Sequence, residues 1–264
     1  MSTVLYIASR SGGPDAGRWA PVGRLDHDAG VYRFVYTHGA KLFGFAAFPG
    51  MDDLQRVYES DELFPLFANR LLSPSRPEYE AFLRWGGFST AQPPDPLLVL
   101  GVTQGLRQTD PLEVFACPTP DAAGRYQSKF FLHGVRWMHD TARERIARLA
   151  PGERLTPALE IGSRFDPSAV SVRTDDAVGR SLIGYVPRYL AKDVRDLCAT
   201  CDPEHIELAV ERVNTDAPLQ HRVLCRVSAC WPDDFSPCSG EAFQPLVELP
   251  SRMHPTGRAG AARG

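Results

Sequence analysis

The sequence lacks any uninterrupted apolar run that approaches the roughly 20 residues of a membrane-spanning helix. Its first ten residues, Met1–Arg10, also lack the charged start and the long apolar core of a secretory signal peptide. We therefore expect a cytoplasmic protein without a membrane partner. In that compartment its six cysteines would be mostly reduced.

Lysine is scarce, since Lys41, Lys129 and Lys192 are the only lysines among 29 basic residues. Arginine offers planar, two-pronged contacts with phosphate, although GC-rich codon usage explains such a bias more often than function does. The net charge of −3 creates no general attraction for nucleic acid. Residues 1–120 carry 10 basic and 13 acidic side chains and residues 121–264 carry 19 of each, so any contact with nucleic acid must be local.

Recognisable catalytic motifs are also missing. The sequence has no G-x-S-x-G nucleophile turn, no phosphate-binding loop with Gly-Lys-Ser/Thr and no H-E-x-x-H metal motif. His133, His139 and Asp140 lie close together in the sequence, but the pattern identifies no partner for them. We therefore predict that the protein is not an enzyme and needs no cofactor.

One cysteine pair has metal-binding spacing. Cys198 and Cys201 form a C-x2-C pair followed by His205, which is typical of half of a zinc site. The second half is missing, because Cys225 and Cys230 lie in an apolar run where cysteine usually behaves as a small hydrophobic residue. Cys198, Cys201 and His205 are therefore candidate ligands, but we predict no metal site.

The first 118 residues predict a β meander with helices. Strands are predicted over residues 4–8, 19–25, 31–37 and 112–117, and the second and third of these alternate apolar and polar residues. The helical spacing of apolar residues predicts helices that begin at Asp52, near Ser75 and at Asp95. The breaker-rich segment Pro118–Gly124 marks a domain boundary, and we assign residues 119–125 to the linker.

Residues 126–235 predict a second unit, a small β-barrel with one or two helices. Strands are predicted over residues 128–135, 155–161, 182–186, 206–213 and 222–230, with a further strand that begins at Ala169. Helices are predicted over residues 141–149 and 187–197. Residues 236–264 predict an extended tail that is disordered from Arg252 onwards. The expected fold class is thus α+β.

The stretch from Glu160 to Lys192 carries the most specific pattern. Arg164, Phe165 and Asp166 lie at a turn before Pro167, a strand follows, and Ile183-Gly-Tyr-Val-Pro187 then leads into a helix. An upstream motif reads Gly134-Val-Arg-Trp-Met138. The two motifs, in this order, resemble the HIRAN domain over residues 126–232. That family has a small, OB-like β-barrel and is known for gripping the 3′ end of single-stranded DNA.

The HIRAN resemblance and the chemistry of a DNA end indicate the same residues. Arg136 would contact phosphate, while Trp137 and Phe165 would stack on bases. Asp166 would accept a hydrogen bond from a free 3′-hydroxyl group, which an internal phosphodiester lacks. Further phosphate contacts are predicted for four other cations, namely Arg164, Arg188, Lys192 and Lys129.

Each assignment has a structural alternative. Asp166 can cap its own turn, Trp137 and Phe165 can be core aromatics, and the cations can be solvated surface charges. The sequence also departs from the family, because Met138 stands where a second aromatic usually follows and Phe165 replaces a tyrosine.

Residues 1–118 resemble the N-terminal subdomain of HipA-type kinases, through spaced apolar blocks such as Tyr32–Tyr36 and Asp95–Leu100. No kinase catalytic motif accompanies them. The resemblance implies a module that contacts a protein partner, such as a kinase or a helicase. We therefore predict a non-catalytic protein that recognises single-stranded DNA 3′ ends. The alternative is a protein-interaction component of a HipA-like toxin–antitoxin or defence system.

Overall fold

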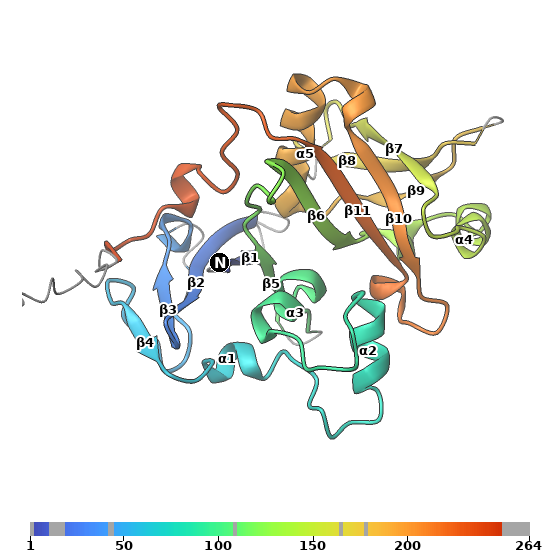
Figure 1. The fold of residues 1–264 in the computed structure, drawn as a ribbon. Coiled ribbons are helices and arrows are strands. Elements are labelled where there is room, and N and C mark those ends of the chain that lie inside the picture. The colour runs from blue at the N-terminus through green and yellow to red at the C-terminus, as the bar shows by residue number, and fades with distance from the viewer. Residues whose placement is uncertain are drawn as a thin grey trace, which may run out of the picture.

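The computed structural model describes residues 3–10, 19–41, 45–107, 110–163, 166–176 and 179–249. Two antiparallel sheets and a few short helices make up an α+β fold (Figure 1), which confirms the predicted fold class in its broad form. No helix within these ranges is long and apolar enough to cross a membrane.

The first sheet has five strands in the order β4-β3-β2-β1-β5. Its strands are β1 (Val4–Arg10), β2 (Trp19–Asp28), β3 (Val31–Tyr36), β4 (Tyr58–Ser60) and β5 (Leu112–Ala116). Ala29 and Gly30, at φ 50° and 83°, make the tight turn between β2 and β3, as the backbone twist of a two-residue hairpin requires. The connection from β4 to β5 contains α1 (Pro65–Ala68), α2 (Tyr79–Trp85) and α3 (Pro96–Thr103).

The helix predicted to begin at Asp52 is wrong. Residues 52–57 form a loop with a turn at Leu54 and Gln55, and Tyr58 begins β4, where it pairs with Phe34 of β3. The Tyr58 hydroxyl accepts a hydrogen bond from the Asp53 backbone N–H at 2.8 Å and closes this turn. Tertiary pairing with the edge of the sheet therefore overrides a short helical spacing, as it often does.

The second sheet has six antiparallel strands in the order β6-β11-β10-β7-β8-β9 and curls into a half-barrel (Figure 1). Its strands are β6 (Arg125–Phe131), β7 (Arg154–Leu159), β8 (Val170–Thr174), β9 (Leu182–Tyr185), β10 (Glu207–Val213) and β11 (Val223–Cys230). An isolated bridge joins His133, just after β6, to Tyr185 of β9, with backbone N–O distances of 3.0 and 2.9 Å. The two edges of this sheet therefore meet at one point.

Two helices, α4 (Asp140–Ala147) and α5 (Arg188–Thr200), pack on the second sheet. α5 buries one apolar face, which includes Leu190, Val194 and Leu197, in the same core as the sheet. Pro187 occupies the N-cap of α5, one position before its predicted place. Its fixed φ suits this entry into the helix.

The two sheets share one buried core at their junction. Tyr6 and Phe115 of the first sheet belong to the same apolar cluster as the second sheet. Phe115 stacks on Tyr189 of α5 with ring centroids 4.6 Å apart, and Trp85 of α2 stacks on His221 at 6.1 Å. The first half (the predicted unit of residues 1–118) and the second half (the predicted unit of residues 126–235) are thus packed together rather than held only by a linker.

The predicted tail over residues 236–264 is described as far as residue 249. Residues 236–249 return to the first sheet (Figure 1), where the Leu246 backbone N–H donates to the Tyr36 carbonyl oxygen at 2.8 Å. The predicted disorder from Arg252 lies outside the described residues.

Asp193 of α5 gives a pH-dependent prediction. The residue is 6% exposed, and its carboxyl group accepts a hydrogen bond from the Tyr126 hydroxyl at 3.4 Å. Burial raises the pKa of Asp193 to about 7, so the folded protein holds a proton that the unfolded chain releases near pH 4. The free energy of unfolding should therefore fall as the pH rises from about 4 to 7.

Asp193→Asn should remove this loss of stability. We compare the free energy of unfolding of the variant with that of the wild type at the same pH. The variant minus wild-type difference should be on the order of 2 kcal/mol larger at pH 8 than at pH 5. Urea unfolding at both pH values measures it. Asp61→Asn, at an exposed aspartate next to β4 in the other sheet, should show no such difference. An equal effect of Asp193→Asn at both pH values would contradict the prediction.

Candidate nucleic-acid interface

The turn after β6 places its aromatic ring outward. The 3-10 helix η3 (Val135–Trp137) follows Gly134, which has a φ of 76°. A Cβ on Gly134 would lie 3.1 Å from the Tyr185 ring, so both the backbone and the close approach favour glycine. Val135 is buried, whereas Trp137 is 73% exposed. Trp137 is therefore not the core aromatic of the alternative interpretation.

Arg136 and Trp137 form one exposed unit. The Arg136 guanidinium carbon lies 4.6 Å from the centroid of the Trp137 ring, which is a cation–π contact. Arg143 of α4 donates from Nη2 to the Arg136 carbonyl oxygen at 2.6 Å and fixes the backbone of the turn. The next residue, Met138, is buried, so the position at which the HIRAN resemblance expects a second aromatic belongs here to the core.

Asp166 lies in the loop between β7 and β8 and caps its own turn. Its Oδ1 accepts from the Ser168 backbone N–H at 2.9 Å, and its Oδ2 lies 3.7 Å from Nε of Arg188. The Asp166 side chain is 19% exposed. The capping alternative therefore holds for Oδ1, and Oδ2 is the oxygen whose partner is a side chain.

The other predicted DNA contacts include two lysines, and both of these form ion pairs. Arg164 and Phe165 lie outside the described residues. Lys192 is 77% exposed and forms an ion pair with Asp196 one turn along α5. Lys129 pairs with Glu211 across the second sheet.

The end of β9 relates the two candidate groups. Tyr185 pairs with His133 on one side, just before the turn of Arg136 and Trp137. Three residues further on, Arg188 begins α5 and meets Asp166. Sequence reasoning treated Tyr185 as part of a strand and missed its contact with Gly134. The signal was available in the glycine that precedes the Arg-Trp pair.

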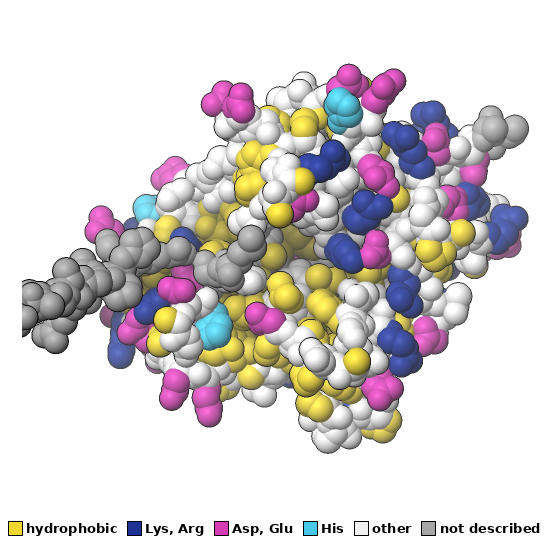
Figure 2. Space-filling view, viewed as in Figure 1, with side chains coloured by type: hydrophobic (Ala, Val, Ile, Leu, Met, Phe, Trp, Pro, Cys, Tyr) yellow, Lys and Arg dark blue, Asp and Glu magenta, His cyan; other side chains and the backbone are white. Residues whose placement is uncertain are grey.

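The surface over the second sheet carries charges of both signs. Figure 2 shows Lys and Arg side chains interspersed with Asp and Glu on the face in view. Arg226 of β11 illustrates this, because it pairs with Glu207 at 2.8 Å and lies 3.6 Å from Glu211. Any attraction for phosphate is therefore local, as the composition predicts.

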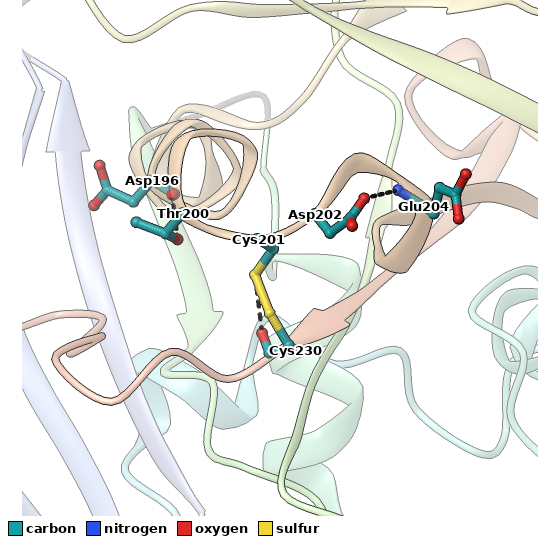
Figure 3. Close-up of a disulfide and its surroundings, with 6 residues drawn as sticks. All are labelled: Asp196, Thr200, Cys201, Asp202, Glu204 and Cys230. Atoms are coloured by element: carbon teal, nitrogen blue, oxygen red, sulfur yellow. Dashed lines mark hydrogen bonds between the residues drawn. A yellow bond between two sulfur atoms is a disulfide. The ribbon is translucent and has the colours of Figure 1, made fainter.

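The cysteines arrange themselves differently from the zinc pattern. Cys201, at the end of α5, forms a disulfide with Cys230, at the end of β11 (Figure 3). Cys198 remains a free thiol. Because its sulfur is in a disulfide, Cys201 has no thiolate to offer a metal ion. The expectation that this cysteine is reduced is therefore wrong. Cys117, Cys198, Cys225 and Cys238 are free. Within the described part of the chain, no three His, Cys, Asp or Glu residues are grouped to hold a metal ion.

Comparison with known proteins adds no assignment: no family model, no curated protein and no solved structure matches this chain. The resemblances to HIRAN and HipA-type proteins therefore rest on the residues quoted for them.

Proposed function

We propose that the second half of the chain is a HIRAN-like, OB-like barrel that binds the 3′ ends of single-stranded DNA without catalysis. One observation carries the proposal: Trp137, 73% exposed, holds its ring beside the guanidinium of Arg136 on a braced turn. A water-exposed indole next to a cation suits a base and its phosphate. The half-barrel supports the proposal, because OB-type barrels commonly bind oligonucleotides.

The residues have distinct roles in this proposal. Trp137 stacks on a base, and Arg136 contacts the adjacent phosphate. Arg188 and Lys192 supply further positive charge along α5. Asp166 keeps Oδ1 on its own turn and offers Oδ2 to the terminal hydroxyl, in place of part of its contact with Arg188. Arg164 and Phe165, from the same loop, are expected to add a cation and a second ring through the family resemblance.

The selectivity for ends can be tested with fluorescent oligonucleotides that carry either a 3′-hydroxyl or a 3′-phosphate group. The wild type should prefer the hydroxyl strand, since the Asp166 carboxylate repels phosphate. Asp166→Asn retains an acceptor for the Ser168 N–H and removes only the charge, so it should abolish the preference without disturbing the turn. Arg136→Ala should weaken binding of both strands.

Arg173→Ala serves as the matched control, because Arg173 is an exposed arginine on β8 of the same sheet. It should bind both strands like the wild type. Equal and negligible affinity of the wild-type protein for the two oligonucleotides would overturn the proposed function. RNA of the same sequence in the same assay determines which sugar is preferred.

A further inference from the structure

A glutamine from the first half of the chain reaches the base of the Arg136–Trp137 turn. Gln104 follows α3 in a left-handed conformation, with φ 62°, and is 1% exposed. Its backbone carbonyl oxygen accepts from the Val114 N–H of β5 at 2.9 Å, so it is anchored in the first sheet. Its side-chain Oε1 lies 2.9 Å from Nε2 of His133. A neutral His133 with its proton on Nε2 donates this hydrogen bond.

His133 is the residue at which the turn is attached to the barrel. Its backbone N–H and C=O both pair with Tyr185 of β9. Gly134, which follows directly, fits against the Tyr185 ring, and its carbonyl oxygen accepts from the Trp137 N–H at 2.8 Å. The placement of His133 therefore sets where Gly134, and with it the Trp137 backbone, can lie.

The turn is thus held at two places. Arg143 of α4 holds its middle through the Arg136 carbonyl oxygen, and the Gln104–His133 hydrogen bond holds its start. The first brace comes from the second half of the chain and the other from the first half. Burial lowers the pKa of His133, which keeps the ring neutral and able to act in this way at neutral pH.

We infer that Gln104 is a positioning residue for the nucleic-acid site, and that the first half of the chain is a structural part of that site. This rests on the proposed function and extends it. The first half then acts on nucleic-acid binding through His133 without touching the ligand. Any partner that displaces the end of α3 would shift the Arg136–Trp137 turn.

Three variants of the full chain test the inference. Gln104→Met keeps the size of the side chain but loses the acceptor, and Gln104→Glu keeps an acceptor for His133. Gln127→Met makes the same change at an exposed glutamine of β6 that bonds to Asp121. We expect Gln104→Met to bind a 3′-hydroxyl oligonucleotide roughly 5-fold more weakly. Gln104→Glu and Gln127→Met should bind like the wild type.

A second readout separates positioning from general loss of structure. The indole N–H resonance of Trp137, assigned with Trp137→Phe, should move in Gln104→Met without ligand and stay in place in Gln127→Met. Leu25→Ala, on β2 in the buried core of the first half, should lower the unfolding temperature without moving this resonance. Unchanged affinity and an unmoved resonance in Gln104→Met would overturn the inference.

The two proposals fail in different ways. If the wild type binds no oligonucleotide, the proposed function is wrong, and the Trp137 resonance alone decides whether Gln104 positions the turn. If the wild type binds and Gln104→Met binds equally well, the function stands and the positioning role is wrong.

Discussion

Replacing Trp137 with alanine should lower the affinity for single-stranded DNA roughly 5- to 150-fold, because stacking on an aromatic ring contributes about 1–3 kcal/mol per base. The same substitution should leave the unfolding temperature unchanged, because the side chain is 73% exposed. Fluorescence anisotropy with a short 3′-hydroxyl oligonucleotide measures the first effect. Thermal unfolding followed by circular dichroism measures the second.

Two further variants sharpen this test. Trp137→Phe retains a ring and should recover most of the binding. Leu98→Ala removes another exposed apolar side chain, 49% exposed, from α3 in the first half, and should change neither quantity. Wild-type affinity in Trp137→Ala would contradict the stacking role. A fall of several degrees in its unfolding temperature would show that the indole belongs to the core.

Reducing the disulfide between Cys201 and Cys230 should lower the free energy of unfolding by about 3–4 kcal/mol, on the chain-entropy account of a loop of this size. The two cysteines are 29 residues apart and join the end of α5 to the end of β11. The crosslink reduces the conformational entropy of the unfolded chain over that loop, which stabilises the folded state. Urea unfolding with and without dithiothreitol measures the effect.

Two serine substitutions on α5 provide a test and its control. Cys201→Ser should unfold like the reduced wild type and become insensitive to dithiothreitol. Cys198→Ser, three residues earlier on the same helix, should keep the full response to the reductant, because Cys198 is a free thiol. Six reactive thiols in unfolded wild-type protein that has never met a reductant would contradict the pairing.

Much of the fold could be predicted from local patterns. The alternation of β2 and β3 is determined within a few residues, so both strands were predicted as neighbours in a meander, and they pair. The apolar run of α3 begins after Asp95, whose Oδ1 accepts from the Leu97 N–H at 2.8 Å, and this start was also predicted. The helix predicted at Asp52 was wrong because the structure there depends on the pairing of Tyr58 with Phe34 of β3, which is distant in sequence.

The candidate site shows the same division. The Gly134–Met138 motif indicated Arg136 and Trp137, but exposure decided that Trp137 points outward and Met138 inward. Asp166 was identified together with its capping alternative, and the structure shows that its two oxygens have different partners. No local spacing could indicate Gln104, since it contacts His133 from 29 positions away.

The disulfide illustrates the limit most clearly. The C-x2-C spacing drew attention to Cys198 and Cys201, yet Cys201 bonds to Cys230. Which cysteines meet is decided by the packing of α5 against β11, and the connectivity of several cysteines cannot be deduced from spacing alone.

The return of residues 236–249 to the first sheet has an architectural consequence. Segments that build the first half lie before and after the second half in the sequence. The second half is therefore a unit inserted into the first. Its entrance and exit are neighbours, because Arg125 of β6 is the register partner of Cys230 of β11. An inserted domain requires chain ends that lie close together, because a short turn can then join the surrounding unit where the inserted one is absent. The chain therefore enters and leaves the inserted unit on the neighbouring strands β6 and β11.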